Sequence, residues 1–137
     1  MTDQVEIVIA NRPAEKARAL DLVERFGRER GCPTPRIHKL QLAVEEHLTN
    51  ILGHAYEDDL DHEIIVRAQW RKGCLAIQIE DDGRAFNPLD RPPPDLTLPL
   101  DQRPIGGLGI HMIRHSVDAV EYRRKDNRNI LSLKLNH

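Results

Sequence analysis

Glu46 and Asn50 are the two residues of this sequence best spaced to do chemistry together. They lie four residues apart in the amphipathic stretch LQLAVEEHLTNILGH, at positions 40–54, so one helical turn stacks their side chains on the same face. A carboxylate can accept the proton of an attacking hydroxyl group or water. An amide oxygen is a ligand that Mg²⁺ accepts beside waters and phosphate oxygens. The alternative is an ordinary solvated helix face, because both residue types are common on helices.

A second candidate is the segment IEDDGRAF, residues 79–86. Asp81 comes at the end of a predicted strand, where a buried acid can accept a hydrogen bond from a ligand amine. Gly83 lets the backbone pass close to a ligand. A plain Asp-Gly turn explains the same residues equally well.

A third candidate is the glycine cluster PIGGLGI, residues 104–110. Glycines that precede a helix expose amide hydrogens and the positive helix end, which suits phosphate binding. No Lys-Ser or Lys-Thr follows, so this is not a Walker loop, and the spacing does not match a dinucleotide fingerprint. A flexible hinge is the alternative.

The elements that must position these residues follow from hydrophobic periodicity and turn residues. Asn11 and Thr34 precede prolines and are expected to cap helices. The predicted strands are 4–10, 63–70, 75–80, 117–124 and 129–135, and the predicted helices are 13–30, 34–56 and 110–116. This order predicts an α+β two-layer sandwich, with a mixed β-sheet and the helices on one face.

A proline-rich stretch interrupts the pattern at residues 82–104, which hold six of the nine prolines. Such a segment cannot be a helix or a central strand. We therefore predict a lid over about 82–108 and expect it to be mobile without a ligand.

Composition indicates one globular domain over residues 1–137, with 39% hydrophobic and 31% charged residues. The net charge of −2 and the 4% aromatic content give no support for nucleic-acid binding. No apolar run is long enough to span a membrane, and the N-terminus has no signal-peptide pattern, so a cytoplasmic location is expected. Cys32 and Cys74 do not have metal-ligand spacing.

Taken together, E-x-x-x-N, D-x-G, a proline-rich lid and G-G-x-G before a helix resemble the GHKL, or Bergerat, ATP-binding fold. The resemblance covers residues 5–135. The stretch AVEEHLTNILGHAY and the short chain look most like the branch of anti-sigma-factor serine/threonine kinases.

The resemblance implies roles for individual residues. Glu46 matches the general base, Asn50 the magnesium ligand and Asp81 the acceptor of the adenine amine. Other ATP-binding positions implied by the same motifs are Gly83, Ala85, Gly106, Gly107, Leu108 and Gly109.

Two positions depart from the family pattern. Ala85 replaces the second glycine of D-x-G-x-G, and alanine disfavours positive φ. The Gly-Thr of the last strand reads Asn129-Ile130, so the hydroxyl contact near the adenine is either lost or supplied by Ser132.

The implied function is that of an ATP-binding anti-sigma regulatory factor that uses Mg²⁺. It would phosphorylate an anti-sigma-factor antagonist and sequester a sigma factor, and the resemblance also implies a homodimer. The alternatives are a partner switch that binds ATP without catalysis and a detached histidine-kinase catalytic domain. The latter needs a phosphoacceptor helix pair upstream, and nothing precedes residue 5 here that would form one.

Overall fold

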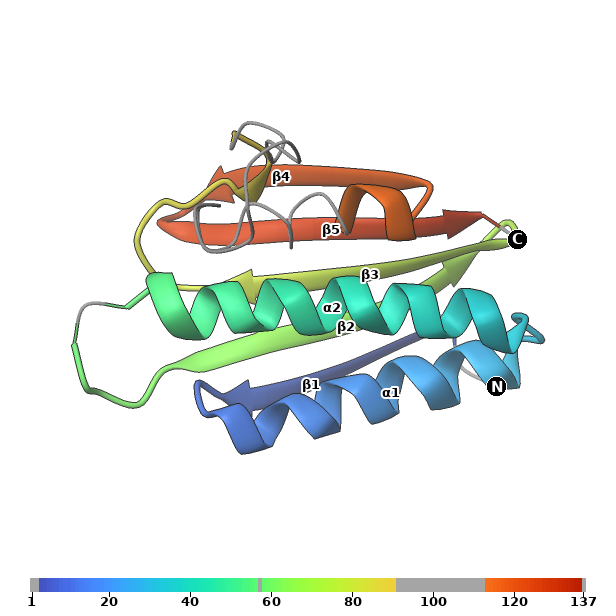
Figure 1. Ribbon diagram of the computed structural model, residues 1–137, viewed down its shortest axis with the longest axis horizontal. Coiled ribbons are helices and arrows are strands. Elements are labelled where there is room, and N and C mark those ends of the chain that lie inside the picture. Colours follow the sequence, from blue (N-terminus) through green and yellow to red (C-terminus); the bar gives the residue numbers. More distant parts are fainter. Residues whose placement is uncertain (1–2, 57, 91–112, 137) are drawn as a thin grey trace, which may run out of the picture.

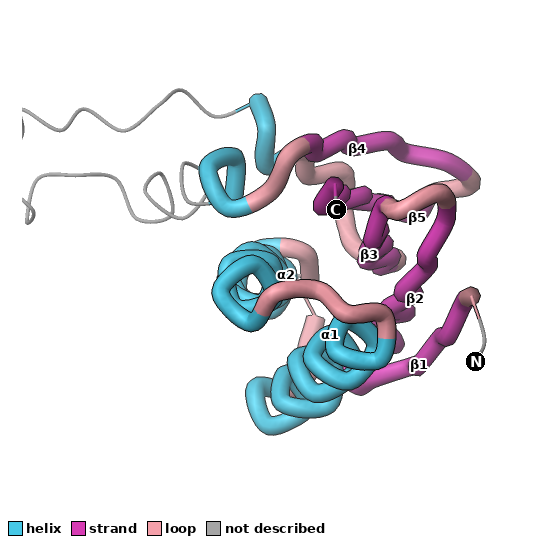
Figure 2. Tube along the Cα trace, turned by 90° about the vertical axis from the view of Figure 1, so that its right-hand side faces the viewer, coloured by secondary structure: helices cyan, strands magenta, loops and turns pink. Residues whose placement is uncertain are grey.

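The computed structural model describes residues 3–56, 58–90 and 113–136 as two layers. Five strands form a single sheet in the order β1-β2-β3-β5-β4, and two long helices cover one face of it (Figures 1 and 2). The strands are β1 (Gln4–Ala10), β2 (Glu63–Arg71), β3 (Cys74–Asp81), β4 (Ala119–Lys125) and β5 (Arg128–Asn136). The helical elements are η1 (Pro13–Glu15), α1 (Lys16–Glu29), α2 (Thr34–His54) and η2 (Pro88–Asp90), and residues 113–116 are also helical.

The predicted α+β two-layer sandwich is confirmed, but each described strand pairing is antiparallel, where a mixed sheet was expected. The reason lies in the connection between β1 and β2, which holds two helices of opposite direction (Figure 1). The second helix takes the chain back along the first, so β2 runs opposite to β1. Tight turns then join β2 to β3 and β4 to β5, which reverses direction each time.

Alternation along the strands creates the core. In β3, Leu75, Ile77 and Ile79 are fully buried, whereas the residues between them are only partly covered. The same buried cluster contains Leu40, Val44, Leu48 and Ile51 of α2. Burial of such side chains is the main term that stabilises the fold.

The two helices approach each other closely at Gly27. A Cβ at that position would lie 3.0 Å from Cγ1 of Ile37 in α2, so the glycine permits the contact. Gly31 has a φ of +77° and ends α1 as predicted.

The two expected side-chain caps are absent. Arg12 and Pro33 occupy the cap positions, and neither makes a side-chain capping bond. Asn11 is instead used between segments: its Oδ1 accepts the amide hydrogen of His62 at 2.9 Å, and its Nδ2 donates to the carbonyl of Leu60.

The sheet face away from the helices carries a row of ion pairs across four strands. Arg67 of β2 pairs with Glu6 of β1 at 2.7 Å and with Glu80 of β3 at 3.0 Å, and Glu80 also pairs with Arg128 of β5. Since successive strand residues face opposite sides, this row lies directly behind Asp81 and Asn129, which face the helices.

Candidate functional site

Glu46 and Asn50 both lie on α2, one helical turn apart. Glu46 is half-buried, whereas Asn50 is only 5% exposed. Within the described residues, the Nδ2 atom of Asn50 has no hydrogen-bond partner. A buried amide without a partner is unfavourable by about 1–3 kcal/mol, so it indicates a position that a ligand completes.

Asn50 also fits the chemistry of a magnesium ligand. A carboxamide presents its oxygen and its nitrogen in nearly the same volume, so a half-turn of the amide offers an oxygen at this position. Glu46, one turn earlier, adds negative charge close by. The predicted pair therefore lies one helical turn apart on α2, and the Nδ2 atom of Asn50 has no partner among the described residues that a bound ligand would have to displace.

His47 is a buried neighbour of this pair that sequence reasoning did not single out. Its side chain is 2% exposed, and neither ring nitrogen has a partner in the described part of the chain. Burial lowers the pKa of His47 to about 4. The imidazole is consequently neutral at neutral pH.

Asp81, at the end of β3, is 1% exposed. Its Oδ1 accepts two hydrogen bonds, from the amide of Gly83 at 2.9 Å and from Nδ2 of Asn129 at 3.0 Å. The other oxygen, Oδ2, accepts none from the residues that the structure describes. Burial raises the pKa of Asp81, and the hydrogen bonds from Asn129 and Gly83 oppose that shift. The arrangement leaves one carboxylate oxygen ready to accept a hydrogen from a ligand.

Gly83 is required by a contact with the protein itself. A Cβ there would lie 2.5 Å from the carbonyl oxygen of Ala55 and 2.6 Å from its Cβ, closer than real atoms approach. The next residue, Arg84, donates from its amide to the same carbonyl at 2.9 Å and from Nε to the carbonyl of His54 at 2.6 Å. The segment after Asp81 is thus seated on the C-terminal end of α2.

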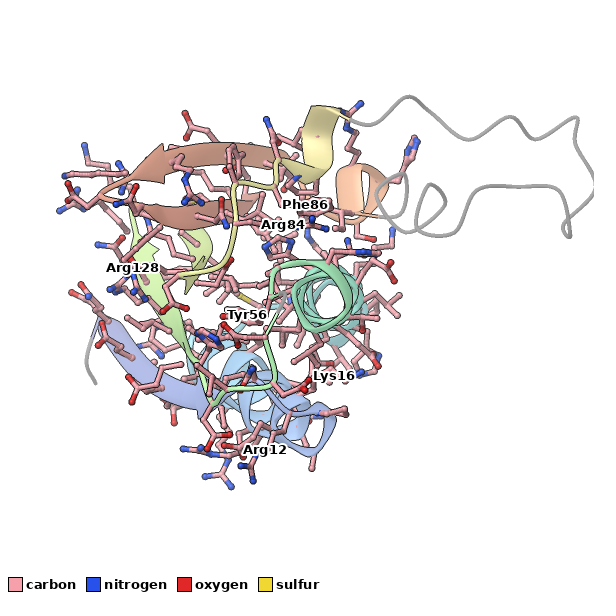
Figure 3. The ribbon with its side chains drawn as sticks, turned by 90° about the vertical axis from the view of Figure 1, so that its left-hand side faces the viewer. Arg12, Lys16, Tyr56, Arg84, Phe86 and Arg128 are labelled. Carbon is pink, nitrogen blue, oxygen red and sulfur yellow. The ribbon has the colours of Figure 1, made fainter. Side chains whose placement is uncertain are left out.

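The ring of Phe86 stacks on His54, with centroids 5.9 Å apart and an interplanar angle of 23°. Figure 3 shows Arg84 and Phe86 between the end of α2 and the β4–β5 side of the sheet. Ala85 between them is exposed and is not among the residues with positive φ. Alanine at the second glycine position of the motif is therefore accommodated without backbone strain.

Asn129 is the residue that sequence reasoning missed. It lies directly opposite Asp81 in the β3–β5 register, is 3% exposed, and donates a hydrogen bond from Nδ2 to Oδ1 of that acid. Ser132, the other residue considered for this contact, is opposite Gln78 and belongs to the uncovered sheet face. The prediction for Ser132 is wrong because three positions along a strand lead to the other face.

The remaining predicted positions, Gly106, Gly107, Leu108 and Gly109, lie outside the described residues, as does most of the predicted lid at 82–108. That this lid is mobile without a ligand also stays a prediction. In the part of the chain that the structure describes, no group of three His, Cys, Asp or Glu residues could hold a metal ion. None of the described helices is long and apolar enough to cross a membrane.

A family model described as "Histidine kinase-like ATPase domain" matches residues 9–135. The chain is 32% identical over 94 residues to the serine/threonine-protein kinase BtrW of Bordetella bronchiseptica. This aligned region covers 69% of this chain and 66% of that protein. It is 30% identical over 102 residues to the serine-protein kinase RsbW of Bacillus thuringiensis, covering 72% and 63%. The matched region thus spans slightly less than two thirds of the length of these relatives.

Solved structures agree on the fold. A Mycobacterium tuberculosis protein with RsbU and RsbW domains superposes with a TM-score of 0.71 at 15% identity, over 98% of this chain and 32% of that one. The Acinetobacter baumannii histidine kinase AdeS superposes with a TM-score of 0.52 at 12% identity, over 96% and 67%.

Proposed function

Since the chain belongs to the histidine kinase-like ATPase domain family, the GHKL resemblance read from its motifs is confirmed, and we propose that it is an ATP-dependent protein serine/threonine kinase. The observation that carries this proposal is that two groups suited to ATP binding occur in the same domain: Asp81 at the end of β3, and the pair Glu46 and Asn50 on α2. The hydrogen bonds that the described residues donate to Asp81 go to Oδ1, and α2 carries Glu46 and Asn50, whose Nδ2 atom has no partner in the described part of the chain. The names of the two kinase relatives support the same activity.

We assign each residue a role in phosphoryl transfer. The free oxygen of Asp81 accepts a hydrogen from the 6-amino group of adenine. Asn50 would hold a magnesium ion, and that ion would supply positive charge to neutralise the phosphate oxygens. Glu46 accepts the proton of a serine or threonine hydroxyl as that oxygen attacks the γ-phosphorus and the bond to the β-phosphate oxygen breaks. Most of the rate enhancement would come from positioning. The glycines at 106, 107 and 109 are proposed to contact the phosphates.

The proposed substrate is an anti-sigma-factor antagonist, and the proposed second partner is a sigma factor bound by the same surface. A cytoplasmic location belongs to the same proposal. We further propose a homodimer formed along β1, an edge strand of the sheet. Beside it lies a groove between β1 and α1, where apolar side chains are flanked by both charge signs: Val5, Ile7, Leu22, Phe26, Arg18, Asp21, Arg25 and Glu29. Mixed charges suit an isologous interface, and light scattering of the purified chain tests it.

The deciding experiment measures transfer of labelled phosphate from ATP to a cognate antagonist, together with calorimetric ATP binding. Glu46→Gln should bind ATP like the wild type while transfer falls by about 10²–10⁴-fold. Glu45→Gln, the exposed neighbouring acid on the same helix, is the matched control and should leave both unchanged. Full transfer by Glu46→Gln would refute the base. ATP binding without transfer to any antagonist would favour a non-catalytic switch, and phosphorylation of a partner histidine would favour a histidine-kinase domain.

A further inference from the structure

The side chain of Asn129 makes hydrogen bonds to β3, to β4 and to the segment that follows β3. Building on the proposed function, we propose that Asn129 is the positioning residue of the purine site. It joins Asp81 and residues 83–86 into one unit and keeps Asp81 a pure hydrogen-bond acceptor, so that the site selects adenine over guanine.

The nitrogen of the Asn129 side chain is directed at acceptors. Nδ2 donates to Oδ1 of Asp81 at 3.0 Å and to the carbonyl of Arg84 at 2.8 Å, with the carbonyl of Gly83 at 3.5 Å. One amide group therefore holds both the end of β3 and the segment that follows it.

The oxygen of the same side chain is directed at donors. Oδ1 accepts from the hydroxyl of Tyr122, from Nη1 of Arg124 at 3.0 Å and from the amide of Phe86 at 3.3 Å. The same Nη1 atom of Arg124 also donates to the carbonyl of Gly83 at 3.0 Å. Turning the amide over would set its hydrogens against three donors and its oxygen against a carboxylate and two carbonyls. Its orientation is consequently fixed.

This fixed donor matters because Asp81 is buried. Burial favours the protonated carboxyl, whereas hydrogen bonds from Asn129 and Gly83 favour the ionised one. An ionised carboxylate only accepts hydrogens: it suits the 6-amino group of adenine and repels the 6-oxo group of guanine. A protonated Asp81 could instead donate to that oxo group. Loss of the Asn129 donor should therefore weaken base selection, and more so as the pH falls.

The test compares Asn129→Leu, which has a similar volume but no donor, with Ser132→Ala on the opposite face of the same strand. Calorimetry measures ATP and GTP affinity between about pH 8 and pH 5.5. We expect wild type and Ser132→Ala to prefer ATP with little pH dependence across this range. In Asn129→Leu, ATP affinity should fall about tenfold or more, and the ratio of ATP to GTP affinity should decrease as the pH falls.

Two further measurements keep the outcome decisive. Tyr122→Phe removes one donor that orients the Asn129 oxygen, so a smaller change in the same direction is expected even if Asn129→Leu fails to fold. The carboxyl carbon of Asp81 can be titrated by NMR without nucleotide, and its pKa should be higher in either variant than in wild type.

Each result then has one meaning. Absence of ATP binding by the wild type refutes the proposed function, and the Asp81 titration alone decides the role of Asn129. An unchanged Asp81 titration together with unchanged base selection in the folded variants overturns the inference, whatever happens to affinity.

Discussion

The buried imidazole of His47 should make the fold sensitive to acid. The ring is 2% exposed, its nitrogens have no partner among the described residues, and burial lowers its pKa from 6.5 to about 4. Between these two values the unfolded chain binds a proton that the folded chain does not. The free energy of unfolding therefore rises with pH in this window, and stability is lost as the pH falls below 6.5.

The size of this effect follows from the two pKa values. Linkage gives a loss of about 2 kcal/mol between about pH 7.5 and pH 5, and about 3 kcal/mol once the pH is below 4. Other groups also titrate in this range. The pKa of His62 is raised by hydrogen bonds to Asp58 and Asp82, so its contribution has the opposite sign and is lost as the pH rises.

A substitution isolates the His47 term. His47→Leu replaces the ring by a side chain of similar volume that does not titrate. Urea unfolding of wild type and His47→Leu at about pH 7.5 and pH 5 gives a double difference in which contributions shared by both proteins cancel. We expect wild type to lose about 2 kcal/mol more than the variant. An equal loss in both proteins would show that the ring finds a partner or water when it is protonated, and would refute the reasoning.

Other consequences are tested in the same way. Gly83→Ala should destabilise the fold by about 1–3 kcal/mol and weaken ATP binding, because its Cβ would lie 2.5 Å from the carbonyl oxygen of Ala55. The control is Gly53→Ala on α2, where a Cβ would meet nothing within 4 Å. This variant should gain up to about 1 kcal/mol in the free energy of unfolding. Similar stability changes in both would contradict the contact. The NMR titration of the His62 ring should give a pKa above its usual value of 6.5, and a value below it would mean that the two carboxylates do not hold the ring. Arg67→Gln breaks the ion-pair row and should cost about 1 kcal/mol or less, an effect that shrinks at high salt; a salt-independent loss would point to packing instead.

The sequence was most informative where function depends on local spacing. Glu46 and Asn50 are four apart on a helix, so their proximity follows from helical geometry alone. The end of β3 at Asp81 was likewise predictable within one residue, because alternation and the Asp-Gly pair mark it.

Asn129 could not be found in this way. Its importance comes from the β3–β5 register, which places it opposite a residue 48 positions earlier in the chain. Register is a property of the whole sheet, and nothing in the neighbourhood of Asn129 encodes it. Leu42 shows the same limit for burial: it is apolar and lies on the central helix, yet it is 47% exposed because the packing of α1 and the sheet decides which stripe is covered.

The close seating of Gly83 and Arg84 on the last turn of α2 has a mechanical consequence. In the proposed site, the segment that would line the base pocket contacts the helix that carries Glu46 directly, through the main chain of Gly83 and through the side chains of Arg84 and Phe86. A modified purine that displaces this segment should also displace the C-terminal end of α2. Substituents on the base should therefore change the alignment of the γ-phosphate relative to Glu46.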